Sequence, residues 1–370
     1  MRIGVLTSSR ADYGIYLPLL RLLHEAPDFE LSIIAFGTHL SPYHGYTVRQ
    51  IEADGFPIRA RVESLIVGDS EEAIALAMGT TLSKFAGLWE RWRDQFDWVL
   101  ALGDRYEMFA AVSAAVPFAI PIAHLHGGET TLGAIDNTFR HCITHCAQLH
   151  FTATAAYAAK VVELKGKAEG VHCVGALSLS GLPDQDLLNA AAFRERFGID
   201  LGRPTILSTF HPETLRVEQN TAHAETLVAV FDQLAAHYQI VLTMPNADTM
   251  GGALRRVFAA HAERSERFIA VENFGKRGYF TAMRDCALLL GNTSSGIIEA
   301  ASFGKYVVNL GDRQRGRARS ANVLDVAVEA EAILGAVTQI EARGMTYTGD
   351  NIYYNPRVAE DILDRLRALR

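Results

Sequence analysis

Three imidazoles and two carboxylates lie close together in the stretch IAHLHGGETTLGAIDNTFRH: those of His124, His126, His141, Glu129 and Asp136. Carboxylates and imidazoles at one site can supply the acid and the base that move a carbon-bound proton, and burial can bring their pKa values toward neutrality. Each also has a structural explanation, because a histidine can bond to the backbone and Asp136 can cap the next helix. We expect His126, Glu129 and Asp136 to take part in proton transfer.

A second candidate is the segment WVLALGDRYEMFAA, in which an apolar run ends in Gly103, Asp104 and Arg105. Asp104 stands at the end of a predicted strand, where catalytic acids often lie. We expect it to be catalytic and Arg105 to contact the substrate. The alternative is an aspartate that caps the next helix beside a solvated arginine, so the motif is weak when it stands alone.

The segment CALLLGNTSSGIIEA indicates a phosphate site. It runs from an apolar strand through Ser294, Ser295 and Gly296 into a predicted helix. Serine hydroxyls and free backbone N–H groups at a helix N-terminus donate hydrogen bonds to phosphate oxygens, and the helix dipole favours the negative charge. Glu299 follows one turn later, where its carboxylate can accept bonds from both ribose hydroxyls. The alternative is an ordinary helix cap with an incidental glutamate.

Further polar loops follow apolar runs in the second half of the chain. His211 follows a predicted strand in LSTFHPET, and Asn246 follows the next one in LTMPNADTMGG, so an imidazole and an amide are available for diphosphate, proton or sugar contacts. Each alone is indistinguishable from turn chemistry. In GDRQRGRARSAN, Arg313 is the first of four arginines that form a local cationic loop. Such a loop can bind an anion, although a solvated loop explains it nearly as well.

Alternating elements must position these loops. Apolar β-rich runs such as RIGVLT, LSIIAFG and DWVLALGD alternate with amphipathic stretches, which predicts an α/β fold with parallel sheets covered by helices. After a stretch rich in Gly, Ser and Pro near residues 175–188, the pattern restarts with PTILSTF and YQIVLTM. We predict two domains, residues 1–178 and 188–355, with a C-terminal helix in 356–370 that packs back on the first.

The same pattern predicts where a ligand binds. Ligands of open α/β sheets lie outside the carboxyl ends of the strands, so we expect a cleft between the two domains. No G-x-G-x-x-G follows the first strand, which leaves a nicotinamide or flavin oxidoreductase without support from its fingerprint. The stretch from Ser70 to Gln95 is the longest helical candidate, and we expect its Trp89 and Trp92 in the core or an interface.

Bulk composition limits the class of protein. The 370 residues carry a net charge of −7, which argues against a surface for nucleic acid or anionic membranes. No apolar stretch is long enough to span a bilayer, and the N-terminus resembles a buried strand and not a secretory signal, so we predict a cytoplasmic protein. The four cysteines lack disulfide spacing. In HCITHC, the histidine pair and the cysteine pair lie about 100° apart around a helix, which favours packing over a metal site.

Seven motifs follow one another over nearly the whole chain: TSSRADYG, LGDRYE, HLHGGETTLGAIDNTFRH, TFHPET, MPNAD, GNTSSGIIEA and VNLGDRQRGR. Together they resemble the hydrolysing UDP-N-acetylglucosamine 2-epimerases of sialic-acid-type sugar biosynthesis. The resemblance implies two Rossmann-like domains of the glycosyltransferase-B type, no nicotinamide cofactor and no metal. It implies conversion of UDP-N-acetylglucosamine to N-acetylmannosamine and UDP, in which UDP leaves to give a glycal and water then adds. By the same analogy we expect a homo-oligomer, a dimer or a tetramer.

The resemblance also implies roles for residues at matching positions. It assigns the diphosphate to Ser294 and Ser295, the ribose to Glu299, further nucleotide contacts to Arg10, His211 and Arg313, and proton transfer to Asp104 and Asp136. One position departs from the pattern, because many relatives have a glutamate where this chain has His126. The change either moves the base role to His126 or Glu129 or marks a related substrate.

Several functions therefore stay open. UDP-2,4-diacetamido-2,4,6-trideoxyglucose, the substrate of a close relative on the way to legionaminic acid, is an alternative to UDP-N-acetylglucosamine, and HGGETTLGAIDN looks more like that branch. The rival functions are a non-hydrolysing epimerase, a glycosyltransferase of the same architecture and a nucleotide-sugar sensor. Only the hydrolysing epimerase releases UDP and exchanges the C2 hydrogen without an acceptor.

Overall fold

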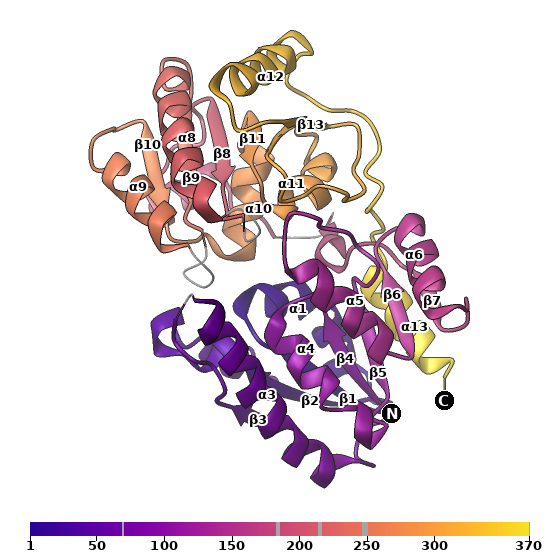
Figure 1. Ribbon diagram of the computed structural model, residues 1–370. Coiled ribbons are helices and arrows are strands. Elements are labelled where there is room, and N and C mark those ends of the chain that lie inside the picture. The colour runs from indigo at the N-terminus through magenta and orange to yellow at the C-terminus, as the bar shows by residue number, and fades with distance from the viewer. Residues whose placement is uncertain (69, 183–185, 214–216, 246–250, 370) are drawn as a thin grey trace. The chain divides into compact units, whose positions relative to one another are not determined.

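The computed structural model describes residues 1–68, 70–182, 186–213, 217–245 and 251–369, which form two compact units (Figure 1). The first unit comprises Met1–Glu129, Asp136–Pro183 and Tyr353–Arg370, and the second comprises Thr130–Ile135 and Asp184–Ile352. The short stretch 130–135 therefore groups with the second unit although its neighbours in sequence belong to the first.

The first unit is built on a seven-stranded sheet in which every neighbouring pair is parallel. In spatial order its strands are β3 (Ile58–Val62), β2 (Glu30–Phe36), β1 (Arg2–Thr7), β4 (Trp98–Leu102), β5 (Ile122–Leu125), β6 (Leu149–Thr152) and β7 (Val171–Cys173). The chain runs from β1 outward to β3 and then returns to β4 on the other side of β1. The order thus reverses between β1 and β4.

Helices cover both faces of this sheet (Figure 1). The α-helices of the unit are α1 (Arg10–Glu25), α2 (Val48–Ala53), α3 (Glu71–Trp92), α4 (Tyr106–Ser113), α5 (Asp136–Cys146), α6 (Ala155–Lys165) and α13 (Val358–Arg367), and short 3₁₀ turns are η1 (Gly37–Leu40), η2 (Pro42–His44), η3 (Val116–Phe118) and η4 (Leu177–Leu179). One buried cluster joins the sheet to α1, α2 and α13, and a second joins it to α3, α4 and α5. Trp89 of α3 lies in the second cluster, as predicted.

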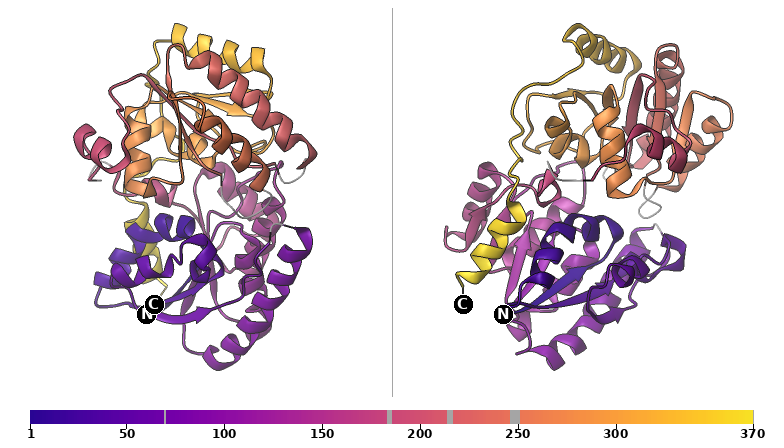
Figure 2. Two further views of the ribbon diagram at one scale, coloured as in Figure 1. Left: turned by 90° about the vertical axis from the view of Figure 1, so that its left-hand side faces the viewer. Right: turned by 180° about the vertical axis from the view of Figure 1, so that it is seen from behind.

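The C-terminal helix α13 completes the first unit. Its apolar side chains, among them Ile362 and Leu366, join the same buried cluster as Leu19 and Leu23 of α1. Arg367 pairs with the Asp28 carboxylate at 3.1 Å, and the N-terminal ammonium donates to the Asp28 carbonyl at 2.7 Å. The two chain ends consequently lie side by side (Figure 2).

The second unit has a six-stranded parallel sheet. In spatial order its strands are β10 (Phe268–Val271), β9 (Gln239–Thr243), β8 (Thr205–Thr209), β11 (Leu288–Gly291), β12 (Val307–Leu310) and β13 (Val323–Val326). Its helices are α7 (Ala190–Phe197), α8 (Asn220–Leu234), α9 (Gly252–Ala262), α10 (Gly275–Asp285), α11 (Ser294–Ile298) and α12 (Ala330–Ala342), with the 3₁₀ turns η6 (Val217–Gln219) and η7 (Ala300–Phe303). The order reverses between β8 and β11, as it does between β1 and β4.

The α/β fold with parallel sheets is confirmed, and each predicted strand is present. The longest predicted helix, from Ser70 to Gln95, corresponds to α3, whose N-cap Ser70 accepts a hydrogen bond from Ala73 N at 3.2 Å. Among the described residues, no helix is both long and apolar enough to cross a membrane.

Candidate active site

Several of the predicted site residues lie at the points where the strand orders reverse. In the first unit, Arg10 follows β1 and Asp104 follows β4; in the second, His211 follows β8 and Ser294 follows β11. At such a reversal the loops of two neighbouring strands lead away to opposite sides, which leaves room for a ligand at the carboxyl edge of the sheet. Each unit therefore presents one set of candidate residues at the expected edge.

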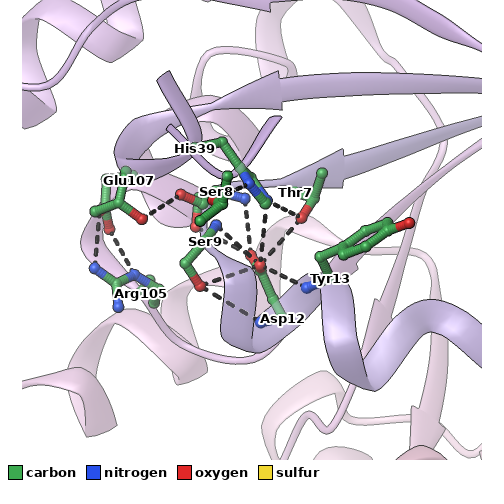
Figure 3. A network of polar contacts seen from close by, with 10 residues as sticks. Thr7, Ser8, Ser9, Asp12, Tyr13, His39, Arg105 and Glu107 are labelled. Carbon is green, nitrogen blue, oxygen red and sulfur yellow. Dashed lines mark hydrogen bonds and ion pairs between the residues drawn. The ribbon is translucent and has the colours of Figure 1, made fainter. Parts of the chain in front are cut away.

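The turn between β1 and α1 is organised by a buried aspartate (Figure 3). Asp12 is 5% exposed, and its carboxylate accepts from the N–H groups of Ser8, Ser9 and Tyr13 at 2.8–2.9 Å and from nearby hydroxyls. Ser9 in turn caps α1 and forms a capping box with Asp12. A carboxylate thus satisfies the N–H groups that a phosphate would use in a Rossmann turn, and Arg10 remains as the exposed cation of this loop.

A buried histidine extends this network. Thr7 Oγ1 donates to Asp12 and lies 2.9 Å from His39 Nε2, while His39 Nδ1 lies 2.8 Å from Thr47 Oγ1. The one hydroxyl proton of Thr7 goes to the carboxylate, so Nε2 carries the ring proton and donates to Thr7. Burial lowers the pKa of His39, which keeps this ring neutral.

The loop after β4 carries Asp104 and Arg105, and the structure gives each a different partner. Arg105 is the N-cap of α4 and forms a bidentate pair with Glu107 at 3.1 and 3.2 Å. The alternative interpretation, in which Asp104 caps this helix, is therefore wrong. Its carboxylate contacts the guanidinium of Arg140, whose second nitrogen donates to the Glu129 carbonyl at 2.9 Å.

His126 has an unusual backbone conformation, with φ of 63°. Left-handed φ is uncommon for residues other than glycine and is held only where surrounding contacts require it. Its Nδ1 lies 2.7 Å from the Glu129 carboxylate, and its Nε2 accepts from the Leu177 N–H at 3.4 Å. Nδ1 therefore carries the proton and donates to Glu129, which is 2% exposed.

His124 and Asp136 differ in their exposure. His124 is fully buried, with Nε2 2.8 Å from the Gly103 carbonyl, and burial lowers its pKa to about 4. It is consequently neutral at pH 7 and supports the loop that carries Asp104. Asp136 is the first residue of α5 and is partly exposed. Asp104, also partly exposed, and Asp136 are thus the two predicted catalytic carboxylates of the first unit that solvent reaches.

The turn between β11 and α11 has the predicted strand-to-helix form. Ser294 and Ser295 begin α11, and Thr293 caps the helix by accepting from Ser295 N at 3.4 Å. Gly296 is buried in the first turn, where an added Cβ would press against Val307 at 3.0 Å. Glu299 ends the helix and is 6% exposed.

The neighbouring loops of the second unit contribute polar groups beside α11. His211 is bound through its main chain to the side chain of Asn292, at 2.7 and 2.8 Å. Arg313 Nη1 donates to the Asn292 carbonyl at 3.1 Å. From α10, the Tyr279 hydroxyl lies 3.5 Å from Thr209 Oγ1, and burial raises its pKa well above the usual range. His211, Ser294 and Arg313 thus belong to one group of cross-linked loops.

The arginine loop is partly built into the second unit. Arg317 is 6% exposed and Arg319 contacts Asp325, so the loop is not uniformly solvated. Stretch 130–135 packs on it: Leu132 N donates to the Arg315 carbonyl at 2.9 Å. A Cβ at Gly133 would collide with the main chain at Asp312.

Sequence reasoning missed several residues that support these loops. Asp12 is signalled by the Ser9-x-x-Asp12 spacing of a capping box. His39, Arg140 and Asn292 make their contacts with residues far away in sequence, so no local pattern signals their roles. The predicted contact Asn246 lies outside the described residues. Within the described ranges, no group of three or more His, Cys, Asp or Glu side chains is arranged to hold a metal ion.

The chain is similar to proteins of known families over most of its length. Residues 21–367 match the family model described as UDP-N-acetylglucosamine 2-epimerase. The chain is 35% identical over 333 residues to the UDP-N,N'-diacetylbacillosamine 2-epimerase (hydrolyzing) of Legionella pneumophila, covering 90% of this chain and 87% of the relative. It is 33% identical over 336 residues to the Polysialic acid biosynthesis protein P7 of Escherichia coli, covering 91% and 85%.

A solved structure shares the fold. The UDP-GlcNAc 2-epimerase from Neisseria meningitidis, bound to UDP-GlcNAc, matches with a TM-score of 0.83 and 16% identity over 100% of both chains. At this identity the likeness concerns the fold alone. It agrees with the predicted glycosyltransferase-B type of architecture.

Proposed function

The chain belongs to the UDP-N-acetylglucosamine 2-epimerase family, and on that premise we propose that it is a hydrolysing epimerase that converts a UDP-2-acetamido sugar to UDP and the free 2-epimer. The observation that carries this proposal is the division of chemistry between the carboxyl edges of the two sheets. The loops at this edge of the second unit present imidazole, guanidinium and hydroxyl groups, whereas those of the first present the candidate carboxylates together with the cations Arg10 and Arg105. The groups of the second unit suit a diphosphate, and the carboxylates of the first unit suit proton transfer.

The second unit is assigned the nucleotide. Ser294, Ser295 and Gly296 lie at the start of α11, where hydroxyl and N–H donors suit the diphosphate, and Arg313 adds a positive charge. Glu299 is assigned to the ribose hydroxyls. His211 is assigned to the leaving diphosphate, whose charge grows as the bond to C1 breaks. Such donors accelerate the reaction only if they bind the leaving group more tightly in the transition state than in the substrate.

The first unit is assigned the proton transfers. Asp104, Glu129 and Asp136 supply the carboxylates, while His126 orients Glu129 because both of its ring nitrogens already have hydrogen-bond partners. Arg140 fixes the position of the Asp104 carboxylate through their ion pair. Arg10 and Arg105 are assigned to the anionic part of the substrate.

The reaction then has two stages. In the first, a carboxylate takes the proton from C2 while the C1–O bond to UDP breaks, which leaves a double bond between C1 and C2. In the second, water adds its oxygen to C1, and a proton returns to C2 from the opposite face. The products are UDP and the sugar with C2 inverted, and the departing diphosphate leaves with the electron pair of the C1–O bond.

We propose the 2,4-diacetamido-2,4,6-trideoxy sugar as the hexose and UDP-N-acetylglucosamine as the second candidate. The Legionella pneumophila relative is named for a diacetylated sugar, UDP-N,N'-diacetylbacillosamine, which supports the diacetamido candidate. The family model that matches residues 21–367 is described as UDP-N-acetylglucosamine 2-epimerase, which supports the second. The two sugars differ at C4 and C6, so the ratio of their kcat/KM values measures the contacts of the enzyme with those two positions.

Incubation with each UDP sugar in deuterated water tests the proposal. We expect free UDP and a sugar that carries one deuterium at C2, detected by mass and proton spectra. An intact UDP sugar with inverted C2 would instead identify a non-hydrolysing epimerase, and UDP release that depends on an added acceptor would identify a glycosyltransferase. Asp104→Asn should abolish deuterium incorporation while UDP still binds. Asp97→Asn, a matched change in an exposed pair with Arg2, should leave turnover intact.

A further inference from the structure

Asn292 is the only residue between β11 and the N-cap Thr293, and its side chain is fully buried. Its amide bonds to the main chain of a residue 81 positions away, on the loop after β8: Oδ1 accepts from His211 N at 2.7 Å, and Nδ2 donates to the His211 carbonyl at 2.8 Å. A backbone N–H can only donate and a carbonyl can only accept, so this orientation of the amide is fixed. Both main-chain polar groups of His211 are thereby held by one side chain.

The main chain of Asn292 makes a second set of bonds. Its carbonyl accepts from Arg313 Nη1 at 3.1 Å and from Gln314 Nε2 at 2.9 Å, and both donors belong to the loop after β12. Gln314 is 1% exposed. One residue thus connects three consecutive loops of the sheet edge, those that follow β8, β11 and β12.

Two further features leave this arrangement little freedom. Gly291 precedes Asn292, and a Cβ there would collide with the Thr209 carbonyl on β8, so β11 and β8 approach closely at their ends. Glu213, 2% exposed, accepts from Asp312 N at 2.8 Å and so ties the β8 loop to the β12 loop directly. A side chain at Gly311, whose φ is 67°, would collide with the Glu213 carboxylate.

We propose that Asn292 is a positioning residue that sets where His211 and Arg313 stand before the ligand binds. Fixed donors cost no reorganisation when the charge of the leaving group develops, which is where preorganisation acts. Asn292 itself need not touch the ligand, because its side-chain amide is already occupied by His211. The role as stated rests on the proposed function, in which His211 and Arg313 bind a UDP diphosphate.

Asn292→Ala tests this role against a matched control. The control is Asn322→Ala, because Asn322 is also fully buried in the second unit and donates to one carbonyl, that of Lys305, at 2.9 Å. Each variant is measured for its melting temperature, its affinity for UDP by calorimetry, and its kcat and KM. Asn292→Ser, which replaces the amide with a shorter neutral hydroxyl, serves as the second variant should the alanine variant not fold.

We expect Asn292→Ala to lose about tenfold or more in UDP affinity and in kcat/KM, since the main-chain N–H and carbonyl of His211 lose their bonds to the Asn292 amide. The serine variant should lose less, and the control should lose stability while its UDP affinity stays within about twofold. Equal losses of UDP affinity in Asn292→Ala and the control, at similar melting temperatures, would overturn the role.

A second readout does not depend on catalysis. In protein with ¹³C-labelled histidine rings, the His211 signal, assigned from His211→Gln, should shift in both Asn292 variants and stay in place in the Asn322 control. An unshifted signal would overturn the role of Asn292 whatever the ligand is. If the parent protein binds no UDP but the His211 signal still shifts in the Asn292 variants, the proposed function is rejected. The positioning of His211 by Asn292 is then retained.

Discussion

Arg140 pairs with Asp104 although the two residues lie 36 positions apart, and the Arg140 side chain is 3% exposed. The Asp104 side chain is 26% exposed, so the pair has one buried partner and one that solvent reaches. The same guanidinium donates to the Glu129 carbonyl at 2.9 Å. The buried cation therefore holds two loops of the first unit, while the carboxylate remains within reach of solvent.

Removing either partner of this pair should have different effects on stability. Arg140→Ala should lower the free energy of unfolding by about 3 kcal/mol, because the Glu129 carbonyl and the Asp104 carboxylate lose a buried partner. Asp104→Asn should lower it by about 1 kcal/mol, since the amide oxygen still accepts from Arg140. Urea denaturation measures both. A loss in Asp104→Asn as large as that in Arg140→Ala would show that the aspartate is needed mainly for folding.

Asp12→Asn should destabilise the first unit. An asparagine offers one acceptor oxygen where the carboxylate offers two, so its NH₂ group would face either the N–H of Ser8 or those of Ser9 and Tyr13. We expect a loss of about 3 kcal/mol in the free energy of unfolding, measured by urea denaturation. The matched variant Asp97→Asn, in an exposed pair with Arg2, should change stability little. Equal effects of the two changes would contradict the role given to Asp12.

The central strands were predictable because strands buried on both faces appear as continuous apolar runs, as β4 does with WVLAL. The edge strands β3, β7 and β13 were not, whereas the edge strand β10 was, from RFIAVENF. β3 has the sequence IRARV with alternating exposure, and β7 has three residues, so neither produces an apolar run. The extra edge strand β13 has VLDV, with no fully buried position. Edge strands are half-covered, and their sequence signal is correspondingly weaker.

The site was predictable in its residue types but not in its contacts. Asp104, His126 and Ser294 could be selected because they follow apolar runs, and strand ends mark the ligand edge of a parallel sheet. The left-handed backbone of His126 has no sequence signature, because most histidines do not adopt it. The bonds of Asn292 to His211 depend on the approach of β11 to β8, which only the folded sheet provides.

The stability of the protein should decrease as the pH is lowered, partly because of His124. Burial lowers its pKa to about 4 in the folded protein, whereas an unfolded histidine titrates near 6.5. Between these values the unfolded chain binds the extra proton, so the contribution of His124 is complete above about pH 6.5 and is lost as the pH falls to about 4. The contribution at pH 7 is about 3 kcal/mol.

Urea denaturation at several pH values between 7 and 4 measures this contribution. His124→Gln should flatten the dependence of unfolding free energy on pH. Some dependence should remain because burial also lowers the pKa of His150, to about 3. His237→Gln, at an exposed position, is the matched control and should keep the parental slope. An unchanged slope in His124→Gln would mean that this ring does not titrate as its burial requires.

Gly133→Ala should weaken binding of UDP although Gly133 itself is not assigned to the nucleotide. The added Cβ meets main-chain atoms of Asp312 and Arg313, which cannot rotate away as a side chain can, so stretch 130–135 or the arginine loop must move. We expect a loss of about 1–3 kcal/mol in stability and a weaker affinity for UDP by calorimetry, because Arg313 is displaced. Gly87→Ala is the matched control: Gly87 lies exposed inside α3, with open space around a Cβ, and the change should raise stability by about 0.5–1 kcal/mol. Unchanged UDP affinity in Gly133→Ala would show that stretch 130–135 does not influence the binding of UDP.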